Sequence, residues 1–140
     1  MSVKERLSEI RKIDSCVNVK SLEVEKLESM AIYKGVTLDP NKGSCGPGGR
    51  PNSGEDLVIR MIDMKNDLNR QIGLLIERKM EGMKIIDSLS DGKMIEIFYM
   101  RYFEYRKWEE IADELGITFQ WVYELHKRGL NELSKKFPNL

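Results

Sequence analysis

Residues 107–133 of this 140-residue chain read KWEEIADELGITFQWVYELHKRGLNEL, and they carry the strongest structural pattern in the sequence. Apolar residues recur at helical spacing on both sides of Gly116, and Thr118 stands two residues after that glycine. Glycine readily adopts the left-handed backbone of a sharp turn, and a threonine hydroxyl can cap the helix that follows. Ala112 is small enough to let the second helix approach closely. The stretch therefore predicts two helices joined by a tight turn, which is the pattern of a helix-turn-helix.

The core positions of this predicted motif carry suitable residue types. Drawn at 3.6 residues per turn, the two helices and their corner share one apolar face, made of Ile111, Leu115, Ile117, Val122 and Leu125. Lys107 stands where a serine or threonine cap would be usual, so we expect a weaker start to the first helix. An ordinary hairpin of two helices would need a similar apolar face and is the alternative interpretation.

The region 91–140 is predicted to be the compact helix-turn-helix domain. It holds all four phenylalanines, both tryptophans and the single histidine. Ser90 or Asp91 can cap a helix through MIEIFYMRYFEY, and Pro138 ends the last helix, which starts at Thr118. No strand pattern competes, so the fold class is all-α.

The region 1–90 is expected to form a long helical hairpin or coiled coil. Helical patterns cover residues 2–34 and 53–89, and Ser53 can cap the second helix. Between them, VTLDPNKGSCGPGGRPNSG (36–54) holds three of the four prolines and many glycines, so it is expected to be a loop.

The apolar stripes of this hairpin are imperfect. The first helix offers Ile13, Val17, Val24, Leu27 and Ala31. The second offers Val58, Met61, Ile62, Leu68, Ile72, Leu75, Ile76, Met83 and Ile86. Lys20, Lys65 and Lys79 fall near core positions, so we expect the N-terminal helices to associate with further copies of the chain.

Composition excludes several classes of protein. The 23 basic and 23 acidic residues balance, and no stretch approaches the 18 apolar residues of a membrane span. The N-terminus lacks the apolar segment of a secretion signal, so a cytoplasmic protein of a bacterial host cell is expected, without membrane association. Cys16, Cys45 and the single His126 form no metal-ligand or catalytic pattern, so we expect no enzyme activity, no metal and no cofactor.

The quoted stretch resembles region 4 of bacterial sigma factors, which reads the −35 promoter element. The whole chain resembles small phage-encoded late regulators of the ArpU/RinA type over residues 20–137, with a Gly/Pro-rich loop before the second helix. The matching positions are Trp108, Glu109, Glu110, Ile111, Ala112, Gly116, Val122, Tyr123, Leu125, His126 and Leu130. The resemblance implies a transcriptional activator of phage or prophage genes that binds double-stranded DNA.

The resemblance also implies a DNA-reading face. It places Phe119, Gln120, Tyr123 and Glu124 at the edge of the major groove. Independently, a helical wheel directs outward Gln120, Tyr123, Glu124, Lys127 and Asn131. Base contacts are therefore expected from Phe119, Gln120, Tyr123, Glu124 and Lys127. Phosphate contacts are expected from Arg106, Lys107, Thr118, Arg128 and Asn131.

Two alternatives to a DNA-binding regulator remain open. Eight basic and nine acidic residues give the region 91–140 a net charge of −1, which is unfavourable for DNA binding by a single copy. The small terminase subunit of a phage, which recognises DNA for packaging, combines similar segments. A module that docks on RNA polymerase without reading DNA is the other alternative, and RNA polymerase is also an expected partner of the regulator.

Overall fold

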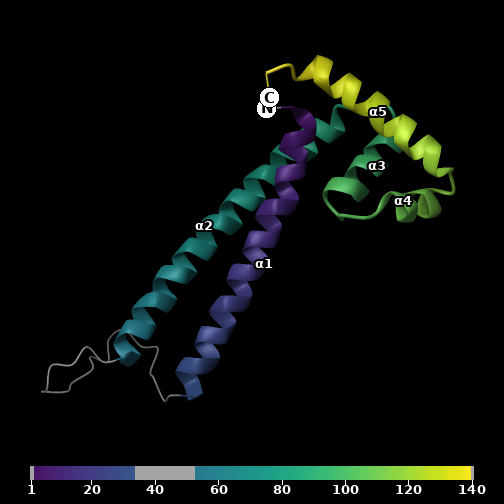
Figure 1. Cartoon of the computed structure of the whole chain (residues 1–140). Coiled ribbons are helices and arrows are strands. Elements are labelled where there is room, and N and C mark those ends of the chain that lie inside the picture. Colours follow the sequence, from purple (N-terminus) through teal and green to yellow (C-terminus); the bar gives the residue numbers. More distant parts are fainter. Residues whose placement is uncertain (1, 34–52, 140) are drawn as a thin grey trace, which may run out of the picture. The chain divides into compact units, whose positions relative to one another are not determined.

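The computed structural model describes residues 2–33 and 53–139 of the chain. These residues form helices and connecting segments without a strand, which confirms the all-α class. Within them, no helix is both long and apolar enough to cross a membrane. The expected loop over 36–54 lies outside the described residues up to position 52, and Ser53 is already helical. The helices, labelled in Figure 1, are α1 (Val3–Tyr33), α2 (Ser53–Asp87), α3 (Gly92–Tyr102), α4 (Trp108–Leu115) and α5 (Phe119–Lys136).

The chain separates into two compact units. The first consists of Met1–Asp14 and Leu74–Leu140, and the second consists of Ser15–Gly73. The start of α1 and the end of α2 therefore belong to the same unit as the three C-terminal helices. The sequence analysis divided the chain into two domains, residues 1–90 and 91–140. That division stays a prediction.

The second unit is a pair of antiparallel helices with little fully buried surface. Its buried apolar side chains in the described range are Val24, Ala31 and Met61. Lys20 pairs with Asp67, and the Nζ of Lys65 lies 2.6 Å from a carboxylate oxygen of Glu28. Two of the lysines that the sequence placed near the core are thus neutralised between α1 and α2.

The apolar stripe expected on α2 is divided between two faces. Met61 and Leu75 are buried, whereas Ile62, Ile72 and Ile76 are exposed. Three members of the expected apolar stripe are therefore exposed within this chain. Ile62 and Ile76 each follow a buried residue by one position, so each is turned about 100° from it around the helix.

In the first unit, the start of α1 packs against the end of α2. Leu7 and Ile10 are fully buried. A Cβ atom added to Gly82 would lie 2.9 Å from the Ile10 side chain, so the absence of a side chain on this glycine permits the close contact. The guanidinium of Arg6 donates to both carboxylate oxygens of Glu81, at 3.1 and 2.9 Å. This ion pair links the start of α1 to the end of α2.

The three C-terminal helices enclose a small core around Phe98. The Phe98 ring is fully buried, and a Cβ on Gly129 would lie 2.5 Å from it. Of the expected core residues, Ile111, Ala112, Val122 and Leu125 are buried, and Leu115 and Ile117 are half-buried. Gly129 thus lets α5 lie directly on α3.

Local capping explains where these helices begin and end. Asp91 accepts from the backbone N–H of Lys93 at the start of α3. Gly116 has φ +64° and ends α4, and the Thr118 hydroxyl accepts from the N–H of Trp121 at 3.1 Å. Lys107 precedes α4 without a side-chain cap. Each of these features agrees with the sequence-based expectation.

Candidate functional site

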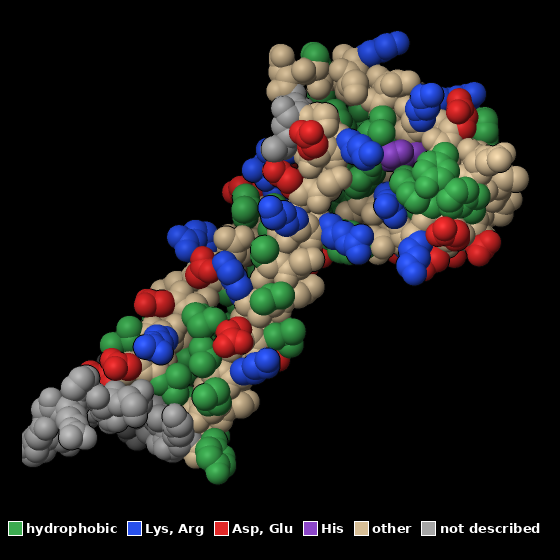
Figure 2. All heavy atoms as spheres, viewed as in Figure 1, with side chains coloured by type: hydrophobic (Ala, Val, Ile, Leu, Met, Phe, Trp, Pro, Cys, Tyr) green, Lys and Arg blue, Asp and Glu red, His purple; other side chains and the backbone are tan. Residues whose placement is uncertain are grey.

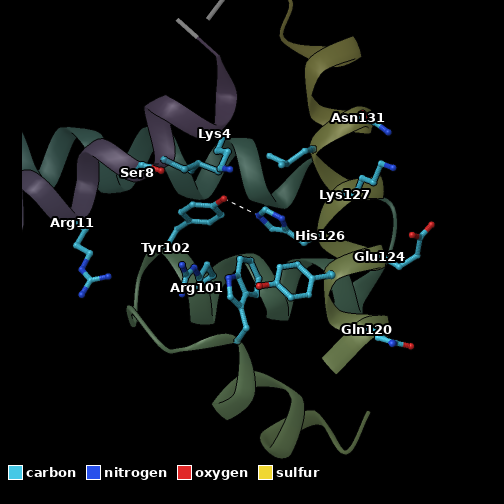
Figure 3. A pocket seen from close by; sticks show the side chains of 14 residues that line it. Lys4, Ser8, Arg11, Arg101, Tyr102, Gln120, Glu124, His126, Lys127 and Asn131 are labelled. Atoms are coloured by element: carbon cyan, nitrogen blue, oxygen red, sulfur yellow. Dashed lines mark hydrogen bonds between the residues drawn. The ribbon is translucent and has the colours of Figure 1, made fainter. Parts of the chain in front are cut away.

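One face of α5 carries four exposed polar residues in a row. Gln120, Glu124, Lys127 and Asn131 recur every three or four positions and therefore share this face. In Figure 3 their side-chain ends point away from the core residue His126. We call this row the polar stripe. It contains three of the five expected base-contacting residues and one of the expected phosphate-contacting residues.

Aromatic side chains gather beside the polar stripe, at the start of α5. Tyr123 is 45% exposed. The centre of its ring lies 5.1 Å from the centre of the Trp108 ring of α4 and 4.7 Å from the centre of the Phe119 ring. Phe119 is 38% exposed. Both expected base-contacting aromatics are therefore accessible, and each is held by a neighbouring ring.

An ion pair links two expected contact residues along α5. The Nε of Arg128 donates to the Glu124 carboxylate at 3.1 Å, and the Arg128 guanidinium lies 5.1 Å from the Trp121 ring centre. Trp121 is 40% exposed and was not among the expected site residues. Its outward position follows from the helical wheel, but a tryptophan is usually assigned to the core.

The remaining expected phosphate contacts differ in their availability. Arg106 is half-buried and pairs with Glu104 and Glu114, at 3.2 and 3.4 Å. Lys107 is exposed at the start of α4. The Thr118 hydroxyl already accepts a backbone hydrogen bond as a cap. Lys107 is therefore the more available of the two expected cations in front of α4.

A hollow of about 670 Å³ borders α5 on the side of Tyr123 and Leu130. Side chains from four helices line it: Lys4, Leu7, Ser8, Arg11, Arg101, Tyr102, Trp108, Gln120, Tyr123, Glu124, His126, Lys127, Leu130 and Asn131. Figure 2 shows basic side chains around the purple histidine and a hydrophobic group next to it. Glu124 is the one carboxylate among the lining residues, so the hollow is strongly cationic.

The floor of the hollow holds a buried pair, His126 and Tyr102. The Tyr102 hydroxyl lies 2.7 Å from the Nε2 of His126, and Figure 3 draws this bond. Burial, together with the positive charges of Lys4 and Arg101, lowers the pKa of His126 to about 4. Burial also raises the pKa of Tyr102 to about 12. At neutral pH both side chains are therefore uncharged, and the Tyr102 hydroxyl and the imidazole Nε2 share one hydrogen bond.

The cations at the rim of this hollow were not expected from the sequence. Lys4 and Arg11 come from the first turns of α1, about a hundred residues before the polar stripe along the chain. Arg101 comes from α3, where its guanidinium lies 4.3 Å from the Trp108 ring centre. Only the tertiary packing of the first unit brings these three residues to α5. No local pattern in the sequence indicates that these three residues lie near α5.

The described part of the chain holds no group of three or more His, Cys, Asp or Glu side chains that could bind a metal ion. The one histidine in the lining of the hollow has its Nε2 bonded to the Tyr102 hydroxyl. The arrangement is suited to binding an anionic surface through cations, amides and aromatic rings.

Comparison with known proteins gives a family without an assigned function. No curated protein and no solved structure matches the chain. A family model covers residues 43–134, which include the whole of α2, α3 and α4 and most of α5 with the polar stripe. The chain therefore belongs to the family described as a protein of unknown function, DUF1492.

Proposed function

We propose that the protein is a sequence-specific DNA-binding regulator that activates phage or prophage genes, of the ArpU/RinA type. One observation carries the proposal. The polar stripe of α5 is exposed along its length, on a helix that is capped by Thr118 and anchored through Gly129. A helix presented in this way fits the major groove, which is about 12 Å wide.

The chemistry of the stripe suits base recognition. The Gln120 amide can pair with adenine through two hydrogen bonds, and a Glu124 carboxylate can accept from the amino group of cytosine. The Glu124–Arg128 ion pair has to open, or share its oxygens, for that contact to form. Phe119 and Tyr123 offer apolar surface to a thymine methyl group. The amide of Asn131 and the ammonium of Lys127 are the other hydrogen-bonding groups of the polar stripe.

The proposal is tested by selecting duplexes from a random pool with the full-length protein. We expect a defined motif to be enriched. Gln120→Ala should relax the preference at one base pair, at a cost of about 1–3 kcal/mol for the preferred base. Ser134→Ala, on an exposed position near the end of α5, is the matched control and should select the original motif. Failure of the wild-type protein to enrich any motif would contradict the proposal.

An acidic face on α4 favours a second candidate function, docking on a basic surface of RNA polymerase. Glu109, Glu110, Asp113 and Glu114 are all exposed. Acidic side chains are repelled by DNA phosphates, so this face of α4 suits a protein partner. Binding to purified polymerase that is lost in Glu110→Lys, without any motif from the DNA selection, would favour docking alone.

We further propose that the protein acts as a homo-oligomer through its long helices. In the second unit, three apolar side chains are fully buried, whereas eight large ones are exposed among the described residues: Val19, Leu22, Met30, Ile32, Tyr33, Ile59, Ile62 and Ile72. A pair of helices with so small a core is marginal in stability by itself. Burial of these side chains against a second copy would supply the missing apolar contact.

A further inference from the structure

The two flanks of α5 differ in charge. Arg128 and Lys135 lie along one side of the polar stripe, and Tyr123 and Leu130 lie along the other. A helix in the major groove has one sugar–phosphate strand along each of its sides. The strand on the side of Arg128 meets cations that α5 itself carries. From α5, the strand on the side of Tyr123 meets only Lys127 of the polar stripe.

The hollow lies along this second flank, and other helices supply three of the four Lys and Arg side chains that line it. Lys4 and Arg11 come from α1, and Arg101 comes from α3. The pKa of His126 is lowered chiefly by burial, and the nearby charges of Lys4 and Arg101 lower it as well. Cations from α1 and α3 are thus concentrated on the flank where α5 supplies only Lys127.

Lys4 and Arg11 are available for an external anion. Both are exposed, and no carboxylate in the described parts of the chain forms an ion pair with either. Arg6, between them, is different, because it pairs with Glu81 at 2.9 Å and so serves the contact between α1 and α2. Ser8 lies between the two free cations on the lining and adds a hydroxyl donor.

We propose that Lys4 and Arg11, with Arg101 behind them, bind the phosphates of the DNA strand that runs along the Tyr123 flank of α5. This inference rests on the proposed DNA-binding function. It assigns the start of α1 to the DNA-binding surface. It also accounts for the net charge of −1 over residues 91–140, because the missing positive charge comes from elsewhere in the same compact unit.

The test is the salt dependence of DNA binding by the full-length protein. The probe is a labelled duplex of about 30 base pairs, roughly three helical turns, carrying the motif enriched by the wild-type protein. The variant Lys4→Gln/Arg11→Gln removes two charges from the hollow. The matched control, Lys12→Gln/Lys26→Gln, removes two charges from exposed positions of the same helix outside the hollow.

Each lost phosphate contact reduces the slope of log K against log salt by about 0.9. We therefore expect the slope to fall by about 2 in Lys4→Gln/Arg11→Gln and to stay unchanged in the control. The base preference should be the same in all three proteins, since phosphate contacts carry no sequence information.

Arg11 also lies 5.7 Å from the Tyr105 ring, so its replacement needs a check on folding. Arg11→Lys keeps the charge and alters that contact, and it should retain the wild-type slope. Motif binding with an equal slope in the wild type and in Lys4→Gln/Arg11→Gln would overturn this inference and leave the proposed function standing. Absence of any motif binding by the wild type would overturn both.

Discussion

At the scale of single residues, the buried His126 makes stability depend on pH. Its pKa is lowered to about 4 in the folded protein, by burial and by the charges of Lys4 and Arg101, whereas an unfolded histidine titrates near 6.5. Between these values the unfolded chain binds the proton and the folded protein does not. The stabilisation is therefore complete above about pH 6.5 and is lost as the pH falls toward 4.

This gives the first stability prediction. Between pH 7 and pH 5 the free energy of unfolding should fall by about 2 kcal/mol, at roughly 1.4 kcal/mol per pH unit within the window. His126→Gln keeps a hydrogen-bonding group beside the Tyr102 hydroxyl but cannot titrate, so its profile should be flatter over this range. Urea denaturation at several pH values measures both. Parallel profiles for the two proteins would show that His126 does not cause the loss of stability between pH 7 and pH 5.

At the scale of helices, two glycines offer a matched comparison. A Cβ on Gly129 would lie 2.5 Å from the buried Phe98 ring, whereas a Cβ on Gly73 of α2 would meet no atom within 4 Å. Alanine is the better helix former by about 1 kcal/mol where space allows. The same substitution should therefore have opposite effects at the two positions.

We expect Gly129→Ala to destabilise the protein by about 1–3 kcal/mol, because α5 has to move away from α3 or the Phe98 ring has to shift. Gly73→Ala should be neutral or stabilising by up to about 1 kcal/mol. Thermal unfolding of the full-length variants, compared at one concentration, checks both. A loss of stability in Gly73→Ala equal to that in Gly129→Ala would contradict the packing described here.

The helix-turn-helix was predictable because its determinants are local. These determinants are Gly116 at the turn, Thr118 at the cap and the helical spacing of the apolar residues. Each acts within a few positions of the chain, and the structure has all three. The uncapped start of α4 at Lys107 was visible for the same reason. Local chemistry therefore predicted this motif and the exposed polar stripe on α5.

Features that depend on distant contacts were not predictable. Apolar residues are spread widely around α2, and the sequence does not show that Met61 is buried while Ile62 is exposed. The approach of Lys4 and Arg11 to α5 likewise follows from packing across most of the chain. The hydrogen bond from Tyr105 to Asp14, at 2.6 Å, joins segments 91 residues apart. Such contacts leave no periodic pattern in the sequence.

At the scale of the whole molecule, the exposed apolar side chains of the second unit predict self-association. Ile62→Glu places a carboxylate among them and should weaken association of the full-length protein by tenfold or more, since burying an unpaired charge costs several kcal/mol. Asn18→Glu adds the same charge at an exposed polar position of α1 and should have little effect. Sedimentation equilibrium measures both, and a wild-type protein that stays monomeric at micromolar concentrations would contradict the prediction.

We propose that this all-α chain reads DNA sequence through α5, and competition binding by the full-length protein tests this proposal. An enriched duplex and a scrambled duplex of equal length and composition are compared at one salt concentration. We expect the enriched duplex to bind about a thousandfold more tightly, the lower range for specific recognition. Equal affinity for the two duplexes would contradict it.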